Sequence, residues 1–254
     1  MRRYWLEKSA VQGDLVTIEG HTLHHIRDVC RQKLGSRFEV LTGEGRALLV
    51  EVIQMGKDFA KAKVLSDRPL AELKRPHLHL ALSLPRYAKM DEIVEKSVEL
   101  GVKELHPFVS DFSFVRHPQD VSAGKTQRWE KIVKAATQQT GRGDLMKVSP
   151  VRDLAHILSE FGNQNKPRWG LFAYEGEGEL SFRQALSAIP RVGGGLEAEG
   201  EIWLFVGSEG GFSPDEVQKF ANLGLKPLKF GEQILRVETA CVALLSVIKY
   251  EFEV

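Results

Sequence analysis

The chain has 254 residues, of which 43% are hydrophobic and 27% are charged. These shares are close to the averages of globular proteins, so a disordered, collagen-like or coiled-coil protein is excluded. No apolar run reaches the roughly 18 residues that a membrane-spanning helix needs. The net charge of +1 argues against binding of nucleic acid through overall charge.

Two features of the sequence concern its cellular compartment. The N-terminal segment Met1–Glu7 carries two arginines but no apolar segment follows them, so a secretory signal is not expected. Cys30 and Cys241 stand far apart without metal-binding spacing, which is typical of free thiols in a reducing cytoplasm. We therefore predict a cytoplasmic protein with no membrane association.

The charges are unevenly distributed along the chain. Residues 1–75 hold 14 Lys and Arg against 10 Asp and Glu, a net charge of +4. Residues 116–152 hold eight basic and three acidic side chains, a net charge of +5. Such basic segments could bind phosphates by releasing counterions, although a solvated surface helix has the same composition.

Residues 1–70 alternate short β-like segments with turns. Apolar and polar residues alternate with period two in four segments between residues 14 and 65, and glycines stand near most of the breaks. One helical segment, Thr22–Arg31, interrupts them. The pattern predicts a small β-barrel-like domain over residues 1–70, and the two prolines within residues 66–76 predict a linker after it.

After Pro76 the pattern changes to strands that alternate with helices. This alternation predicts βαβ units and a mostly parallel sheet with helices on both faces. Two loops are also predicted, at Gly193–Gly195 and at the Glu-rich residues 175–179. The predicted strands are 77–84, 105–109, 169–174, 202–206 and 228–230. The predicted helices are 89–102, 129–140, 151–161, 182–189, 213–223 and 237–252.

Three motifs with specific chemistry are not supported. Gly124–Thr126 resembles the end of a phosphate-binding P-loop, but Gln119 stands where the first glycine is needed and no strand precedes it. No G-x-G-x-x-G sequence follows a strand, so a nicotinamide-binding Rossmann site is excluded. His21, His24 and His25 could face one metal ion, but no carboxylate or cysteine has supporting spacing, and no metal is predicted.

The C-terminal third contains a glycine-rich loop after a strand. Ile202–Val206 is a continuous apolar run, as expected of a buried parallel strand, and it leads into Gly207–Gly211. Ser213 then begins a helix as its N-cap, and Glu216 completes a capping box. Open α/β sheets bind ligands at the carboxyl ends of strands, where glycines let the backbone approach closely. We therefore predict a ligand-binding loop, although a plain tight turn would contain the same glycines.

A second loop of this kind follows shortly after. Phe230–Arg236 leads into the last helix, and its Ile234 and Leu235 are apolar side chains in a loop, where they must pack or line a pocket. Arg236 and Glu238 stand at the start of that helix, where the helix dipole favours a carboxylate. The two loops flank one helix and could form a single cleft.

Four segments together resemble a known family. The sequences VGSEGGFSPDE at 206–216 and FGEQILRVETA at 230–240 closely resemble the SPOUT class of S-adenosylmethionine-dependent RNA methyltransferases. Within that class they resemble the RsmE family, which methylates uracil N3 in small-subunit ribosomal RNA. Residues 89–102 and 134–142 look like the first and second helices of that family. The resemblance extends over nearly the whole chain and departs at Ser208, where the family usually has proline.

The resemblance implies an architecture. It implies an α/β fold: a SPOUT trefoil-knot methyltransferase domain over residues 76–254, preceded by a PUA-like β-barrel RNA-binding domain over residues 1–70. Three loops, those after 169–174, at 207–211 and at 230–236, would converge on the methyl donor. The family is dimeric, so a homodimer is implied, with the last helix in the interface. An ordinary core helix would show the same apolar face, which comprises Val237, Cys241, Leu244, Leu245 and Ile248.

The resemblance also implies the ligands and the site residues. S-adenosylmethionine is the implied cofactor, and small-subunit ribosomal RNA within the 30S subunit is the implied partner, with no metal. The expected cofactor-binding residues are Leu171, Phe172, Gly207, Ser208, Glu209, Gly210, Phe230, Gly231, Ile234, Leu235, Thr239 and Ala240. The expected RNA-binding residues are Arg2, Arg3, Tyr4, Arg27, Arg31, Arg37, Arg116 and Arg128, with Lys125, Lys131 and Lys134 extending the basic surface.

Methylation at uracil N3 predicts particular catalytic groups. N3 carries a proton at neutral pH and itself attacks the methyl group once that proton leaves, so no cysteine nucleophile is needed. Arg142 and Arg236 are expected to stabilise the negative charge that spreads onto the uracil oxygens, although either could form a structural ion pair or a phosphate contact. Glu238 is expected to accept the proton or to orient an arginine.

Two other functions are left open by the sequence. One is an RNA-binding or ribosome-assembly factor whose knotted domain has lost catalysis. The other is a methyltransferase that acts on the ribose 2′-hydroxyl of transfer or ribosomal RNA.

Overall fold

The computed structural model describes residues 1–163, 166–176, 180–190, 200–252 and 254. The chain divides into two compact units, Met1–Glu72 with Lys134–Leu145, and Leu73–Val133 with Met146–Val254. The predicted loop Gly193–Gly195 and residues 177–179 lie outside the described residues. Within the described ranges, no helix has the length and apolarity that crossing a membrane requires.

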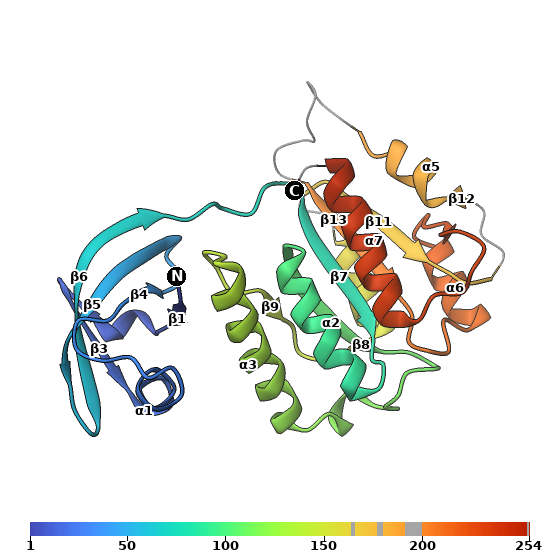
Figure 1. The fold of residues 1–254 in the computed structure, drawn as a ribbon. Helices are drawn as coiled ribbons and strands as arrows, with labels where there is room; N and C mark the ends of the chain where they lie inside the picture. The colour runs from blue at the N-terminus through green and yellow to red at the C-terminus, as the bar shows by residue number, and fades with distance from the viewer. Residues whose placement is uncertain (164–165, 177–179, 191–199, 253) are drawn as a thin grey trace. The chain divides into compact units, whose positions relative to one another are not determined.

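The first unit is built on a mixed β-sheet, drawn in blue in Figure 1. In its described residues the strand order is β1-β4-β5-β6-β3-β2. The period-two pattern buries one face: Val16 and Ile18 of β3 pack with Phe38 of β4 and Val50 of β5 in one core. The strands are β1 (Arg3–Trp5), β2 (Val11–Gln12), β3 (Leu15–Glu19), β4 (Arg37–Leu41), β5 (Arg46–Met55) and β6 (Phe59–Pro69).

Two elements of this unit differ from the prediction. Residues 66–69, the start of the expected linker, are strand, because β6 continues to Pro69 beside β5, with Leu49 opposite Ser66 and Arg46 opposite Pro69. The expected helix Thr22–Arg31 is a short α-helix, α1 (Gly20–His24), that continues as a π-helical turn over His25–Val29.

Residues Lys134–Leu145 belong to the first unit rather than to the second. They include the end of α3 (Ala123–Thr140). Arg3 donates a hydrogen bond to the carbonyl of Gln139 at 3.0 Å, and the backbone N–H of Trp5 donates to the Gln138 side chain at 2.9 Å. These long-range bonds have no signature in the local sequence pattern. The domain limits 1–70 and 76–254 stay a prediction.

The second unit is a parallel α/β sheet. Its order is β10-β8-β7-β13-β11-β14-β12, with β9 beside β8 among the described residues. Its inner strands β7, β8, β11 and β13 pair in parallel, as the alternation of strands and helices predicted. The strands are β7 (His77–Ser83), β8 (Val102–Val109), β9 (Lys147–Val148), β10 (Arg152–Asp153), β11 (Arg168–Ala173), β12 (Leu180–Ser181), β13 (Glu201–Val206) and β14 (Pro227–Lys229).

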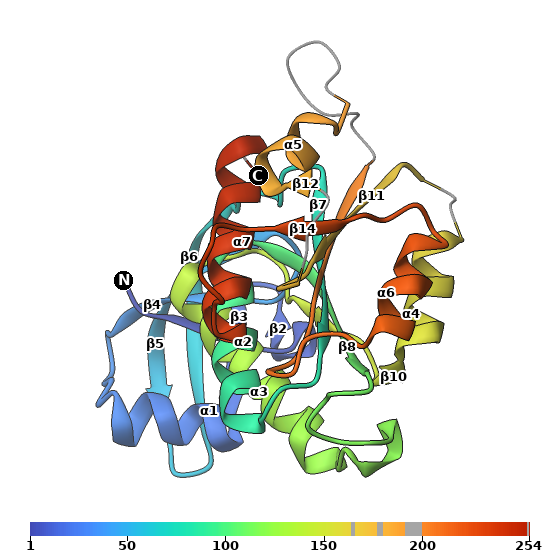
Figure 2. The same cartoon turned by 90° about the vertical axis from the view of Figure 1, so that its right-hand side faces the viewer.

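Helices cover both faces of this sheet. Figure 2 shows α2 and α7 on one face and α4 and α6 on the other. The second face is aromatic: Phe172 of β11 stacks on Phe220 of α6 with 4.0 Å between ring centroids, and Trp203 and Phe205 join the same cluster. The helices are α2 (Tyr87–Glu99), α4 (Leu154–Gly162), α5 (Phe182–Ser187), α6 (Pro214–Ala221) and α7 (Val237–Phe252).

The apolar face of α7 is part of the core of the chain itself. The side chains that the sequence offered for a dimer interface are between 0 and 5% exposed. They are buried because α7 packs against α2 and β13 of the same unit. This face is therefore the one that an ordinary core helix needs, and it is not open to a second subunit. The five residues concerned are Val237, Cys241, Leu244, Leu245 and Ile248.

Candidate functional site

Three loops line one cavity in the second unit. They follow β11, β13 and β14, and they enclose about 410 Å³ together with the start of α7 and Lys89 of α2. Parallel strands place their carboxyl ends at one edge of a sheet, where open α/β folds bind their ligands. The volume is that of a site for a small molecule. The lining residues of the three loops are Ala173–Glu175, Val206–Glu209, Gly211, Phe212 and Lys229–Arg236.

The loop after β13 depends on its glycines. A Cβ atom on Gly207 would lie 2.9 Å from the Cα atom of Gly211, closer than real Cβ atoms approach backbone. Gly211 has a φ of +68°, and a Cβ atom there would collide with the Glu175 carboxylate. The backbone of the loop turns back on itself, since Ser208 and Gly211 form a β-bridge. Side chains at these two glycines would close the space beside the cavity.

The same loop is held by side chains of other elements. Ser208 Oγ donates to the carbonyl of Phe112 at 2.7 Å, so the serine found where the family usually has proline has a partner of its own. Ser213 and Glu216 form the predicted capping box of α6. Buried Glu216 also accepts from the backbone N–H of Asp111 at 2.9 Å. These bonds fix the loop before any ligand binds.

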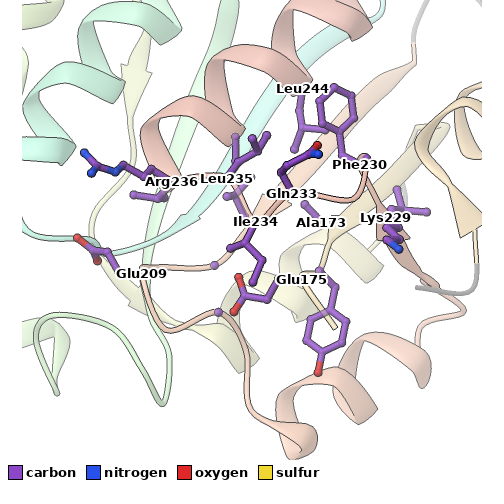
Figure 3. A pocket seen from close by; sticks show the side chains of 18 of the residues that line it. Ala173, Glu175, Glu209, Lys229, Phe230, Gln233, Ile234, Leu235, Arg236 and Leu244 are labelled. Carbon is purple, nitrogen blue, oxygen red and sulfur yellow. The ribbon is translucent and has the colours of Figure 1, made fainter. Parts of the chain in front are cut away.

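The loop after β14 is more open. Gly231 has a φ of +76°, and Ile234 is 78% exposed at the cavity. Phe230 packs edge-on against Phe182 of α5, with ring centroids 5.5 Å apart. In Figure 3, Arg236 lies on the same side of the cavity as Glu209, with Phe230 and Lys229 on the other side. The cavity therefore has one fixed wall and one wall that faces solvent.

Burial and neighbouring charges shift the pKa values of three groups in or near the cavity. Burial alone would raise the pKa of Glu238, but the ion pair with Lys89, the backbone of its own helix and nearby Arg236 hold that pKa below its ordinary value. Glu238 is thus ionised at neutral pH and already bonded, which makes it a weak base. Burial raises the pKa of Glu175, which lines the cavity. Burial also raises the pKa of the Cys241 thiol, so no thiolate nucleophile is at hand.

Most of the predicted cofactor-binding residues lie at this cavity. Leu171 and Phe172 do not line it, because they are buried inside β11 opposite Leu204 and Phe205. Gly210 contacts Phe112 instead. Thr239 lies on α7, exposed, and does not line the cavity either. Those that line it are Gly207, Ser208, Glu209, Phe230, Gly231, Ile234, Leu235 and Ala240.

Several lining residues were missed by the sequence analysis. Ala173 ends the strand in which Leu171 and Phe172 were chosen, and Tyr174 and Glu175 follow it, so the expected residues lie about two positions before the lining ones. Lys89 and Leu244 reach the cavity from helices, and the chain pattern gives no signal for that. Gln233 stands inside the predicted loop, and its position between Gly231 and Ile234 could have identified it.

The predicted catalytic residues lie in different places. Arg236 lines the cavity and is exposed. Glu238 does not line it but bonds Lys89, which does. Arg142 belongs to the first unit, where its buried guanidinium pairs with Asp144 at 2.9 Å. The catalytic roles of these three residues stay predictions.

One predicted RNA-binding residue is in the core. Tyr4 is 2% exposed, and its ring packs edge-on against Phe38 at 4.9 Å, because β1 joins the sheet beside β4. Arg2, Arg31 and Arg116 are exposed. The remaining four have acidic partners: Arg3 pairs with Glu39, Arg27 with Asp28, Arg37 with Glu51 and Arg128 with Asp91.

One group of side chains has the composition of a metal site. Among the described residues, ligand atoms of His79, Glu104 and His106 lie within 4.8 Å of one another. His79 Nδ1 and His106 Nε2 are 3.0 Å apart, a hydrogen-bond distance between two imidazoles. Burial lowers the pKa of each to about 3, so both are neutral at physiological pH. The two rings bond each other, while the buried His106 Nδ1 has no hydrogen-bond partner among the described residues. The absence of a metal stays a prediction.

Comparison with known proteins identifies the family. A family model described as an RNA methyltransferase domain matches residues 72–249, and one described as an RNA methyltransferase PUA domain matches residues 18–65. The first match covers most of the chain. The protein belongs to this family of RNA methyltransferases.

Similar proteins cover the whole chain. Ribosomal RNA small subunit methyltransferase E of Bacillus subtilis (strain 168) is 27% identical over 100% of this chain and 98% of its own length. The enzyme of the same name from Buchnera aphidicola subsp. Acyrthosiphon pisum is 26% identical over 98% and 93%. The resemblance to this family predicted from the sequence is confirmed.

Solved structures share the fold. Ribosomal RNA small subunit methyltransferase E from Neisseria gonorrhoeae, bound to S-adenosylmethionine, has a TM-score of 0.77 at 24% identity and covers 98% of this chain and 97% of its own. A Legionella pneumophila protein described as a putative methyltransferase has a TM-score of 0.82 at 23% identity, over 98% and 96%. The predicted fold class, an α/β SPOUT-like methyltransferase domain after an N-terminal PUA domain, is confirmed.

Proposed function

We propose that the protein transfers a methyl group from S-adenosylmethionine to N3 of a uridine in the 16S RNA of the small ribosomal subunit. The proposal depends on one observation: three strand-end loops line the same cavity. The relatives from Bacillus subtilis and Buchnera aphidicola bear the name of small-subunit ribosomal RNA methyltransferases. The structural neighbour from Neisseria gonorrhoeae holds S-adenosylmethionine.

The residues at the cavity fit this cofactor. Leu228, Phe230, Leu235 and Leu244 supply apolar surface for an adenine ring, and Glu209 supplies a carboxylate for hydroxyl or amino groups. Bare backbone at the glycines lets main-chain groups approach a ligand closely. When bound there, S-adenosylmethionine supplies an electrophilic methyl group on a sulfonium.

The chain supplies the charges that the uracil needs. Arg236 lies at the cavity, exposed, where a guanidinium would stabilise negative charge on the uracil oxygens. Glu238 is held ionised by Lys89, which suits it to orient a cation more than to take the N3 proton. Glu175, whose pKa is raised by burial, is a better proton acceptor at the cavity. Arg142 is proposed as a second stabilising cation.

The RNA and its setting complete the proposal. A PUA-type first unit with exposed Arg2 and Arg31 supports RNA binding, and the substrate is ribosomal RNA within the 30S subunit. The protein acts as a cytoplasmic homodimer. Since the apolar face of α7 is buried, the dimer contact involves other side chains, of which Ile234 at the cavity is one candidate. Light scattering on the purified protein tests the dimer.

The first experiment measures cofactor binding. Calorimetry with S-adenosylmethionine is expected to give one site per chain with micromolar affinity. An absence of heat at millimolar cofactor would favour an RNA-binding or assembly factor without catalysis.

The second experiment identifies the methylated atom. Small-subunit RNA and whole 30S subunits from a strain that lacks the enzyme are incubated with protein and labelled cofactor, and the product nucleoside is mapped by mass spectrometry. We expect a base methyl at uracil N3 and faster transfer to 30S subunits. A ribose methyl would replace the proposal with the 2′-hydroxyl reaction.

The third experiment separates the two arginines. Arg236→Lys and Arg142→Lys keep a positive charge but lose the planar fork of donors. For each variant, we expect the single-turnover rate to fall by at least about tenfold with cofactor affinity within about twofold. An unchanged rate would remove that arginine from the mechanism.

A further inference from the structure

Two phenylalanines are exposed on the segment that is bonded to the loop after β13. Phe112 and Phe114, in the segment between β8 and α3, are 48% and 51% exposed. Ser113 between them is buried. Large aromatic rings that face solvent next to a binding site are typical of surfaces that stack against a partner.

The backbone that carries these rings is firmly held. Ser113 Oγ donates to the carbonyls of Ser110 and Val115, at 2.9 and 2.7 Å. The N–H of Phe114 donates to the carbonyl of Leu84 at 2.9 Å. The two rings are thus exposed on a segment whose backbone is fixed by hydrogen bonds. Their exposure therefore follows from the fold.

This segment is hydrogen-bonded to the loop after β13, which lines the cavity. The Phe112 carbonyl accepts the hydrogen bond from Ser208. A Cβ atom on Gly210 would lie 2.7 Å from Phe112 Cβ, so only glycine leaves room for the ring at that point. Phe112 therefore packs against the loop that lines the cavity, and Phe114 is two residues further along the same segment.

Basic side chains lie on the same segment and beside Tyr87, which Phe114 contacts. Lys125 Nζ lies 4.2 Å from the centroid of Tyr87, and Phe114 packs edge-on against the same tyrosine at 5.4 Å. Arg116 is exposed and donates to the carbonyl of Asp111. Arg86 is exposed as well.

The acidic groups of this surface are largely engaged. Asp111 accepts from Ser213 Oγ, and Asp120 accepts from the backbone N–H of His117. Glu209 accepts from the backbone N–H of Arg86 at 3.3 Å. Exposed aromatic rings near basic side chains have the chemistry that binds single-stranded nucleic acid: stacking on the bases and attraction to the phosphates.

We propose that Phe112 and Phe114 form a stacking platform for the unpaired bases next to the methylated nucleotide. The proposal rests on the proposed function, because it names how the RNA is held at the same site. A target base must leave its stack to reach a cavity, and its neighbours then need new partners for their faces. The platform recognises ring faces and not base edges, so it is tolerant of sequence.

The first test replaces the rings with matched aliphatic side chains. Phe112→Leu and Phe114→Leu keep an apolar side chain but remove the aromatic ring. Phe112→Trp is the conservative variant, which keeps an aromatic ring at that position. The probe is a single-stranded oligouridylate of about ten nucleotides, bound to the full-length protein with S-adenosylhomocysteine present. We expect each leucine variant to raise the Kd by about tenfold and the tryptophan variant to keep it within about twofold.

A control and a second probe sharpen this test. Leu223→Ala removes an exposed apolar side chain at the far end of α6 and is expected to leave the Kd unchanged. A duplex of the same length, whose bases are already stacked, should bind Phe112→Leu and wild type equally. A leucine variant that binds the oligouridylate as tightly as wild type does would overturn the platform.

Salt dependence distinguishes stacking from charge. Phe112→Leu is expected to shift the plot of log Kd against log salt without changing its slope. Arg116→Ala is expected to reduce the slope by about 0.7, the value for one phosphate contact on a single strand. A slope that changes for the phenylalanine variant would show that the ring acts through the charges around it, against the proposal.

A covalent readout locates the contact. Oligouridylate containing 5-iodouracil cross-links to aromatic side chains that stack on it when the carbon–iodine bond is broken by long-wavelength light. We expect mass spectrometry to find the adduct on Phe112 or Phe114. Adducts confined to other residues would overturn the proposal.

The outcomes separate the platform from the proposed function. If wild type methylates uridine and the leucine variants bind RNA normally, the platform alone fails. If wild type binds no S-adenosylmethionine but binds RNA through Phe112, the proposed function fails and the platform stands. If Phe112→Leu instead impairs only self-association, these rings are a contact between two copies of the chain and the platform fails.

Discussion

The two ends of the same parallel sheet use polar groups in opposite ways. At the carboxyl ends of β11, β13 and β14, glycine backbone and exposed side chains surround a cavity. Near the amino ends, His79 and His106 stack on Trp203 with centroids 4.9 and 4.2 Å away. There Glu201 accepts hydrogen bonds from Arg168 at 2.9 Å and from the Trp203 indole at 3.2 Å.

This difference separates stability from function. The side chains of the amino-terminal cluster are mostly buried and largely bond one another. Removing one partner of an ion pair there leaves the other charge buried without a partner. The carboxyl end leaves backbone groups and space for a ligand, so changes there alter binding first. Substitutions at the two ends should therefore have separable effects on unfolding and on cofactor affinity.

The largest expected effect is at the amino-terminal end. Arg168→Met should lower the free energy of unfolding by about 3 kcal/mol, because Glu201 loses its guanidinium partner while it stays mostly buried. Urea unfolding measures this change, and calorimetry should find the affinity for S-adenosylmethionine unchanged. The double variant R168M/E201Q should recover part of the loss. A weakened cofactor site in Arg168→Met would contradict the separation.

The next effect is at the carboxyl end. Gly207→Ala should raise the Kd for S-adenosylmethionine by about 30- to 100-fold, because the new Cβ atom would meet the backbone of Gly211 and force the loop to shift. Gly231→Ala is the matched control in the open loop. Its Cβ atom would have no neighbour closer than 3.9 Å, so only the strain of its φ of +76° is added. Equal losses in both variants would refute the contrast between the fixed and open walls.

The buried imidazoles should make stability depend on pH. The pKa of His106 is lowered by burial to about 3, from an ordinary value of 6.5 in the unfolded chain. Between these values the unfolded state binds more protons, so stability falls as the pH falls. One such group should account for about 2 kcal/mol between about pH 7 and about pH 5.

Replacing one imidazole tests this dependence. His106→Asn should flatten the curve of unfolding free energy against pH, measured by denaturant titration at several pH values. His21→Asn, at an exposed position, should leave the curve as it is in wild type. A curve for His106→Asn that is as steep as that of wild type would place the titrating groups elsewhere.

The smallest effect is expected in the open loop. Glu232→Ala removes an exposed ion pair with Lys229 of 2.9 Å, which is worth about 0.5 kcal/mol or less. Thermal unfolding should be nearly unchanged, and cofactor affinity should stay within about twofold. A large loss of affinity would show that the loop after β14 is as constrained as the loop after β13.

Local signals predicted much of this fold. The capping box of Ser213 and Glu216 and the bounds of α7, Val237–Phe252, were both expected from the sequence and both are present. Caps and helical periodicity depend on residues a few positions apart, so the chain pattern contains them. The glycine-rich loop after β13 was expected because a continuous apolar run, Ile202–Val206, precedes it.

Long-range packing was less predictable. Periodicity indicated that Cys241 and its neighbours on α7 face an apolar surface, but not whether this chain or a partner covers them. The alternation around His79 predicted a strand. It gave no sign that the register between β7 and β8 would bring His79 and His106 together in the interior. Such contacts are set by how strands align, which the sequence of one strand does not specify.

The hydrogen bond from Ser208 to the carbonyl of Phe112 gives the site a mechanical link. It ties the backbone of the loop after β13 to the segment whose rings we propose to stack on RNA bases. If binding of one ligand displaces either surface, the displacement would be passed to the other, and the two proposed sites would then be energetically coupled. By reciprocity, the factor by which donor alters RNA affinity is the factor by which RNA alters donor affinity. This coupling would pass through one serine hydroxyl, and it would be the same whichever of the two ligands binds first.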